Sequence, residues 1–339
     1  MGAGDRLELL IQRCYAGLDV DQLRTEALAR LRGVLTVDAA FFATVDPATV
    51  LFTSAVAEEP LGEVTEQFMA NEFGQDDVNK FAALAGGPVP VRSLEQATKG
   101  DWRNSPRYVE VMRPLGLGDE LRAALISNGQ CWGVLCLHRE DGDTGFSPQD
   151  LQVVRRIAPH LGDGLRRALR TDATGSAGAG PGVVVLDERL RLESVSAEAE
   201  YWLAELGAPG QLPMAVRAVA ARMRLEQVPV RLKVRTAGGQ WLELHASRLG
   251  AVGQTVVVID PVTPAQLGSL LLDLHGLTPA QQRVTELLLR GYSTRQIVEK
   301  LCLSPHTVQE HVRAAYDKVG VGSRRELVSA LLRGSASRG

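Results

Sequence analysis

The sequence predicts a multidomain protein: two α+β domains followed by an all-α domain of four short helices. Three observations indicate this fold class. The length of 339 residues is more than one typical hydrophobic core serves. Apolar strand-like runs alternate with amphipathic helical patterns up to about residue 262. Four helix starts of Ser or Thr then follow one another between residues 278 and 323.

Residues 1–170 form the first predicted domain. Amphipathic helix patterns extend through Val34, and the runs DAAFFATVD and VLFTSAVAE predict a hairpin over 38–58. A second hairpin is predicted over 121–140, and the stretch from 146 to 170 has the cap and the apolar stripe of a long helix. Helices, hairpin strands and a closing helix describe an α+β domain with a sensor-like organisation.

Small and flexible residues divide the rest of the chain. The stretch TDATGSAGAGPG at 171–182 has the composition of a linker. Residues 183–262 follow with two strands, a helix and three further strands. The segment 263–276 predicts a connecting helix, and 277–336 forms the last domain.

The last domain repeats one helix-start pattern. A Ser or Thr that can cap the first turn is followed by Gln or Glu three residues later in three cases, and directly by Pro in the fourth. The four starts are Thr278, Ser293, Ser304 and Ser323. The short connector between the second and third helices predicts a helix–turn–helix, whose second helix can enter a DNA major groove about 12 Å wide.

The predicted helix over 305–319 has two different faces. Val308 and Ala315 recur at helical spacing with other apolar residues, so one face packs inward. The opposite face carries Gln309, Glu310 and Arg313. An ordinary surface helix needs no such set, and these are side chains that can reach base edges.

Charge is distributed unevenly along the chain. The net charge is −3, yet residues 275–339 hold ten Lys or Arg against five Asp or Glu. A basic last domain attached to an acidic body indicates that only this domain meets a polyanion.

Residues 277–332 closely resemble the LuxR-type DNA-binding domain. The resemblance is carried by LTPAQQRVTELLLRGYSTRQIVEKLCLSPHTVQEHVRAAYDKVGVGSRRELV, a long stretch with many positions in fixed register. It implies that the helix over 305–319 is a recognition helix. The family commonly has Lys where Gln309 stands, so Gln309 and Glu310 make this point of the helix less basic.

The resemblance also implies contacts to DNA. Gln309 would bond adenine, Arg313 guanine and Glu310 cytosine. Thr307, Arg295 and Lys318 suit phosphate contacts. The implied DNA-binding residues are Ser293, Thr294, Arg295, Ser304, Thr307, Val308, Gln309, Glu310, Arg313 and Lys318. For Val308, packing in the core is the favoured alternative to a contact with a thymine methyl group.

Two further resemblances concern the body of the chain. The run WGVLCLHR followed by FSPQDLQVVRRIAPHLGDGLRRAL is similar to the end of a GAF domain, a fold that senses small molecules. The element order of 183–262 is similar to that of a PAS domain. Both resemblances imply a sensor, and neither includes a motif specific to one ligand.

Two sets of residues are candidates for binding other molecules. Phe41, Phe52, Trp102 and Trp132 are candidates for a ligand pocket, with core packing as the alternative. Leu327, Val328, Leu331 and Leu332 form an apolar stripe that is a candidate for dimerisation, with packing inside its own domain as the alternative.

Several protein classes do not fit the sequence. No apolar run is long enough to span a membrane, and the four scattered cysteines indicate reduced thiols in a cytoplasm. His306 and His311 are five residues apart and so lie on different helix faces, which argues against a zinc site. No catalytic motif stands out, so we expect no enzyme activity, no cofactor and no metal.

The sequence therefore predicts a cytoplasmic, DNA-binding transcriptional regulator. We expect double-stranded DNA as its partner, a homodimer as its active form, and a small-molecule effector or a regulatory protein as its signal. The alternatives are a signalling protein that the last domain only localises, and an interaction scaffold whose last domain binds a protein partner.

Overall fold

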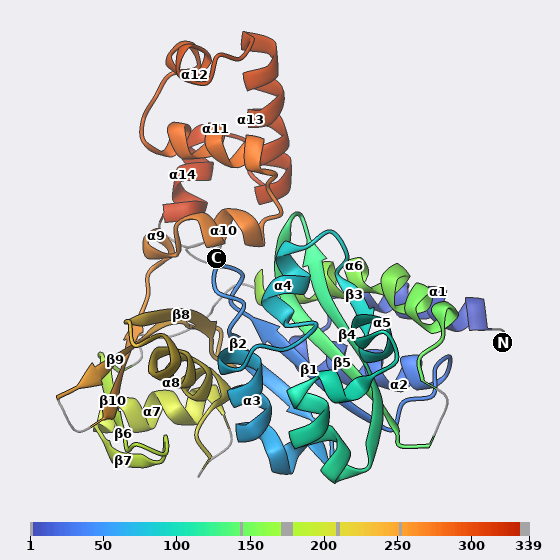
Figure 1. The fold of residues 1–339 in the computed structure, drawn as a ribbon. Helices are drawn as coiled ribbons and strands as arrows, with labels where there is room; N and C mark the ends of the chain where they lie inside the picture. The colour runs from blue at the N-terminus through green and yellow to red at the C-terminus, as the bar shows by residue number, and fades with distance from the viewer. Residues whose placement is uncertain (1–2, 143–144, 171–178, 208–210, 251–252, 333–339) are drawn as a thin grey trace. The chain divides into compact units, whose positions relative to one another are not determined.

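The computed structural model describes the chain except for residues 1–2, 143–144, 171–178, 208–210, 251–252 and 333–339 (Figure 1). Most of the predicted linker over 171–182 lies outside the described residues. The chain forms two compact units, Met1–Pro261 and Val262–Gly339. Among the described helices, none is both long enough and apolar enough to cross a bilayer.

The first unit begins with a five-stranded antiparallel sheet in the order β2-β1-β5-β4-β3. Its strands are β1 (Ala39–Val45), β2 (Phe52–Ala57), β3 (Val91–Ser93), β4 (Leu117–Ser127) and β5 (Gln130–Glu140). The long hairpin of β4 and β5 forms because Asn128 and Gly129 both adopt positive φ at its turn. Both predicted hairpins are therefore present.

Helices cover both faces of this sheet because its strands alternate their side chains between two apolar layers. On one side lie α1 (Ala3–Cys14), α2 (Val20–Arg32) and α6 (Pro148–Arg170). On the other lie α3 (Thr65–Gly74), α4 (Phe81–Gly86) and α5 (Leu94–Thr98). Short helical turns occupy Leu61–Val64, Trp102–Asn104, Tyr108–Met112 and Arg113–Leu115. The α+β class is confirmed.

A second five-stranded antiparallel sheet, ordered β7-β6-β10-β9-β8, completes the first unit. Its strands are β6 (Gly182–Leu186), β7 (Leu192–Val195), β8 (Val230–Arg235), β9 (Trp241–Leu249) and β10 (Gln254–Pro261). Between β7 and β8 the chain forms α7 (Ala197–Leu206) and α8 (Met214–Glu226). Strands β8, β9 and β10 bury alternate residues, as expected of a sheet with one face against the core.

Helix α8 joins the two sheets into one unit. It contacts α3 and β2 of the first sheet's domain as well as β8 and β9 of the second sheet (Figure 1). Ala215, Val216, Ala218, Val219 and Ala220 are all fully buried, so the helix is apolar on more than one side. The two sheets consequently share one hydrophobic core. The two predicted domains therefore pack against each other within one compact unit.

A buried carboxylate adds a polar link across the same interface. Asp46, in the turn after β1, accepts a hydrogen bond of 3.0 Å from the backbone N–H of Lys233 in β8. A second bond, from the backbone N–H of Ala48, holds the carboxylate within its own turn. Burial raises the pKa of Asp46, and these two N–H donors act against that shift.

The second unit is entirely helical. Its helices are α9 (Pro264–Leu267), α10 (Ser269–Leu274), α11 (Pro279–Leu289), α12 (Thr294–Leu301), α13 (Pro305–Val319) and α14 (Arg324–Leu332). All four predicted starts are correct: Thr278, Ser293 and Ser304 cap α11, α12 and α13, and the Ser323 hydroxyl accepts from the N–H of Glu326. One core cluster holds these helices together.

The predicted single connecting helix over 263–276 is wrong in one respect. The segment forms two short helices, α9 and α10, separated at Gly268. Gly268 has φ +54° and ψ −125°, a conformation that side-chain-bearing residues rarely adopt. The glycine therefore ends the first helix and begins the second.

Gly162 allows α6 to approach the first sheet closely. A methyl group at this position would lie 2.8 Å from backbone atoms of Leu125 in β4. We predict that Gly162→Ala lowers the free energy of unfolding by about 1–3 kcal/mol, although Ala is the better helix former. Urea unfolding followed by tryptophan fluorescence tests this, because all four tryptophans lie in the first unit.

Gly4→Ala is the matched control for this prediction. Gly4 also lies in a helix, and nothing lies within 4 Å of a methyl group added there. We expect that change to leave stability unaltered or slightly increased. Equal effects of the two substitutions would show that close packing of α6 is not what requires Gly162.

Candidate functional site

The helix–turn–helix of the second unit is built by local hydrogen bonds. Ser293 and Gln296 form a reciprocal capping box at the start of α12, in which the Ser293 N–H donates to the Gln296 side chain over 2.8 Å. The Ser304 hydroxyl accepts from the N–H of Thr307 at 3.1 Å, at the start of α13. Cys302 makes the turn with φ +53°, and its N–H bonds to the carbonyl of Val298. These bonds set both helix starts.

Packing orients α13. Val308 and Ala315 are both fully buried in the core of the bundle. Because residues on the far side of a helix must then face outward, Gln309, Glu310 and Arg313 are all exposed. The helix presents an amide, a carboxylate and a guanidinium on one polar face, as the sequence predicted.

A second polar pair lies on the same helix. His306 Nε2 is 3.4 Å from Glu310 Oε1, and their side chains are 82% and 63% exposed. Such an exposed pair contributes little to stability, so both groups are available to a binding partner.

The start of α12 is a separate polar region. Ser293, Thr294 and Arg295 are exposed there, and Arg295 Nε lies 3.3 Å from Glu299 Oε1. That ion pair is 90% and 63% exposed, so a phosphate can displace it at little cost. The free N–H groups of a helix start are suited to the same anion.

Two of the residues implied to contact DNA have other roles. Val308 is fully buried and contributes to the core, which is the alternative that the sequence favoured for it. The ammonium group of Lys318 donates to the Gly276 carbonyl at 2.7 Å and to Gln281 Oε1 at 2.9 Å. Lys318 thereby ties α13 to the start of α11. The burial of Val308 agrees with the spacing of the apolar face. The role of Lys318 was not visible from spacing, because it depends on what packs beside the helix.

The stripe chosen for dimerisation is largely core. Leu327 is 0% and Leu331 2% exposed, and both belong to the cluster that holds the bundle together. Val328 is partly exposed, and the side chain of Leu332 lies outside the described residues. The stripe faces inward because α14 closes its own bundle.

The four aromatic residues chosen for a ligand pocket do not line one cavity. Phe41 and Phe52 are buried in a cluster of rings, with centroids 5.2 Å apart. Trp132 is fully buried and donates to the carbonyl of Ser127. Trp102 is half-buried beside a hollow of about 310 Å³, and its indole donates to Glu95 at 2.6 Å. Phe41, Phe52 and Trp132 therefore pack in the core, which was the alternative to a ligand pocket.

The first unit contains a buried charge cluster that the sequence analysis did not predict. It is formed by Glu72, Arg107, Glu120, Arg122 and His138. The register of β4 and β5 places Glu120 opposite His138. Arg107 Nη2 lies 2.6 Å from Glu120, and Arg122 bridges Glu120 at 3.0 Å and Glu72 at 2.6 Å. All five side chains are at most 3% exposed.

The charge cluster controls the protonation of its members. Burial alone would raise the pKa of Glu120, but the guanidinium groups of Arg107 and Arg122 hold it well below its usual range. Burial lowers the pKa of His138 to about 4. The charges of Arg107 and Arg122 also lower this pKa, whereas the charge of Glu120 raises it. Burial and Glu120 raise the pKa of the Cys136 thiol well above its usual value. Cys136 is therefore a protonated, inert thiol.

Three side chains in and beside the cluster place potential metal ligands close to one another. Among the described residues, ligand atoms of Glu120, Cys136 and His138 lie within 4.8 Å of one another. Both oxygens of Glu120, however, are bonded by arginines. A cation there would have to displace two guanidinium groups, so the cluster is better described as a closed ion network.

Comparisons with known proteins match both units. The model of bacterial regulatory proteins of the luxR family matches residues 275–331, and the GAF domain model matches residues 19–165. The spore germination protein GerE of Bacillus subtilis is 39% identical over 57 residues, which are 17% of this chain and 77% of GerE. A protein named as an HTH-type transcriptional regulator of Mycobacterium bovis is 44% identical over 62 residues. That match spans 18% of this chain and only 7% of the mycobacterial protein.

Solved structures resemble the chain only loosely. SdiA of Escherichia coli aligns over 98% of both chains with 10% identity and a TM-score of 0.32. The phycoerythrobilin-bound GAF domain of a cyanobacterial phytochrome aligns over 49% of this chain and 94% of that domain, with 15% identity and a TM-score of 0.33. At these scores the likeness carries no functional argument.

The buried histidine makes stability depend on pH. Unfolding returns His138 to its usual pKa of 6.5, whereas the folded pKa is about 4. Between these values the unfolded chain binds a proton that the folded chain does not, so stability rises with pH. We predict that His138 lowers the stability of the first unit by up to about 3 kcal/mol between pH 7 and pH 4.

Urea unfolding at several pH values, followed by tryptophan fluorescence, measures this effect. His138→Gln should reduce the loss of stability on acidification. The control is His160→Gln, because His160 lies on the surface side of α6 and bonds Tyr15 over 2.8 Å. If His138→Gln kept the full pH dependence of the original chain, His138 would not be the group responsible.

Proposed function

The chain belongs to the LuxR family of bacterial regulatory proteins, and from this we propose that it is a transcriptional regulator that reads double-stranded DNA with α13. The observation that carries the proposal is the polar face of α13. Gln309, Glu310 and Arg313 are exposed together while the opposite face is buried. Amide, carboxylate and guanidinium groups bond to adenine, cytosine and guanine in the major groove.

The start of α12 supports the same mode of binding. Thr294 and Arg295 are exposed beside the free N–H groups of a capped helix start. Contacts from such a region to phosphates position a protein on DNA without reading sequence. We therefore assign phosphate contacts to α12 and base contacts to α13. Lys318 is omitted because its ammonium group is bonded within the bundle.

We further propose that the protein binds DNA as a homodimer. One recognition helix covers only a few base pairs, and a single small module binds with low specificity. Two copies on neighbouring half-sites supply the missing specificity. Leu327 and Leu331 are core residues, so we do not assign the contact between copies to these two side chains.

The first unit is proposed as the sensor of this regulator. A signal bound there would favour one arrangement of the two units over another by its difference in affinity for the two. The signal is a small molecule or a protein partner. The family and the relatives are those of regulators rather than of enzymes.

Arg313→Ala tests the recognition face. We predict a loss of about 1–3 kcal/mol in binding to a specific duplex, together with relaxed preference at one base pair, because a bidentate contact to guanine is removed. The measurement is fluorescence anisotropy of the full chain with the preferred duplex and its single-base variants.

Arg283→Ala is the matched control, since it removes the same charge from an exposed position on α11. We expect it to weaken binding to all duplexes slightly and equally. Unchanged affinity and unchanged base preference for Arg313→Ala would contradict the assignment of α13 as the recognition helix.

A further inference from the structure

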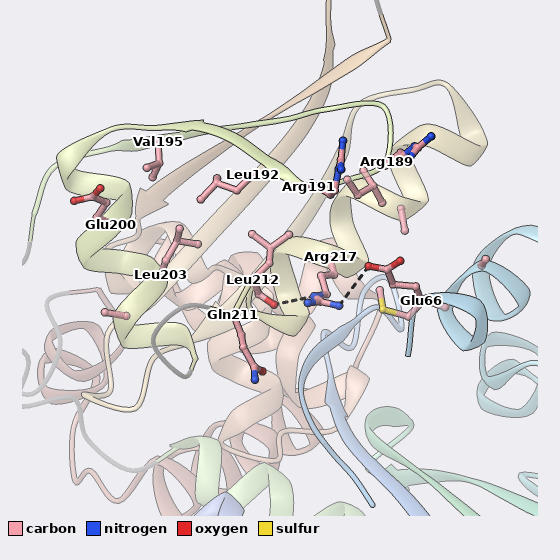
Figure 2. A pocket seen from close by; sticks show the side chains of 15 residues that line it. Glu66, Arg189, Arg191, Leu192, Val195, Glu200, Leu203, Gln211, Leu212 and Arg217 are labelled. Atoms are coloured by element: carbon pink, nitrogen blue, oxygen red, sulfur yellow. Dashed lines mark hydrogen bonds and ion pairs between the residues drawn. The ribbon is translucent and has the colours of Figure 1, made fainter. Parts of the chain in front are cut away.

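A cavity of about 610 Å³ lies within the first unit, apart from the buried charge cluster (Figure 2). One wall comes from α3 of the first sheet's domain. The remaining walls come from the second sheet's domain: the β6–β7 hairpin, α7, α8, and Gln211 and Leu212 just before α8. Its volume is in the range of about 300–1,000 Å³ that small-molecule sites occupy.

Most of the cavity wall is apolar. Met69 contributes from α3, Leu192 and Val195 from the hairpin, and Leu203 from α7. Leu192 is 50% exposed, whereas Met69 is 4% exposed, so the wall runs from the surface into the core. A cavity of this kind gains affinity by burying an apolar body.

Three arginines lie at one end of the cavity. Arg189, Arg191 and Arg217 are found there together with the carboxylate of Glu66, while Glu200 lies at the other end (Figure 2). Arg191 is bonded in a fork to Asp187, at 2.8 Å and 2.7 Å. Arg217 is held differently: its Nε donates to the Leu212 carbonyl at 2.9 Å, which fixes the direction of the guanidinium group.

Arg217 is the residue best placed to take an anion. Its Nη1 is 3.9 Å from Glu66 Oε1, a distance longer than a hydrogen bond, and the Glu66 side chain is 78% exposed. Little energy holds such an exposed carboxylate in place, so a ligand carboxylate can replace it. A guanidinium group binds a carboxylate through two parallel hydrogen bonds.

We propose that this cavity binds an organic monocarboxylate with an apolar tail. The carboxylate pairs with Arg217, and the tail lies along Leu192, Val195 and Leu203. Glu200 at the far end repels the carboxylate and so sets the direction of binding. The role of this ligand as an effector rests on the proposed function, whereas its binding does not.

The position of the cavity explains how an occupant would act. Helix α3 belongs to the first sheet's domain, and α7 belongs to the second. A ligand that contacts both would stabilise the interface that α8 already bridges. Binding should therefore raise the unfolding temperature of the first unit.

Isothermal titration calorimetry of the full chain with octanoate, decanoate and dodecanoate tests the proposal. We expect saturable binding of one molecule per chain for at least one of these probes. Butyrate, which has the charge without the tail, and decanol, which has the tail without the charge, should each bind at least tenfold more weakly.

Variants assign the binding to this cavity. Arg217→Gln should weaken the best carboxylate at least tenfold, and Leu192→Ser, at a half-exposed position, should also weaken it. Arg222→Gln is the control, because Arg222 is also on α8 but pairs with Glu226 and does not line the cavity. Tryptophan fluorescence unfolding of each variant separates lost binding from lost folding.

The proposal is overturned if none of the three carboxylates binds, or if Arg217→Gln and Arg222→Gln bind equally well. DNA binding by the ligand-free chain is measured in parallel. Failure of the chain to bind any duplex would contradict the proposed function and leave the calorimetric result standing.

Discussion

The proposed function depends on one constraint: Val308 and Ala315, on the inner face of α13, are buried in the core of the helical unit. Once these two side chains enter the core of the bundle, the rotation of α13 about its axis is set. Gln309, Glu310 and Arg313 therefore face the solvent, where a binding partner can reach them. Capping by Ser304 and the bond from Lys318 to Gly276 hold the helix in this position from its two ends.

The first unit has a different organising principle. Its two sheets are bound through α8, whose small buried residues let both sheets approach it closely. The interior beneath α3 and α4 holds paired charges together with a cluster of aromatic rings. A cavity of about 610 Å³ lies between helices of the two sheets' domains, and arginines lie at one end of its apolar wall. If the first unit has the sensor role proposed above, a ligand in this space would act at the junction of the two sheets' domains.

Local patterns in the sequence were sufficient to predict the starts of the four main helices of the second unit. Capping residues such as Thr278 and Ser293 act within one turn, so they identify helix starts without knowledge of the fold. Gly268 was the exception, because its positive φ breaks a segment that otherwise has helical spacing. The exposed face of α13 followed from the same periodicity.

Features that depend on distant residues could not be predicted. Arg122 and Glu72 are fifty positions apart and meet only because β4 lies under α3. Lys318 has the sequence context of a phosphate contact, and only the fold shows that its ammonium group is hydrogen-bonded to Gly276 and Gln281. Aromatic residues such as Phe41 and Phe52 occur both in ligand pockets and in hydrophobic cores, and here they form part of an aromatic core. Spacing does not distinguish these cases.

Selection of duplexes from random DNA by the purified full chain tests the central claim most directly. Bound duplexes should converge on one motif, with two related half-sites, and enrichment should weaken steeply as salt is raised. Repeating the selection with cell extract would include any effector the protein requires. A bound pool with the same sequence composition as the input, under both conditions, would contradict the account.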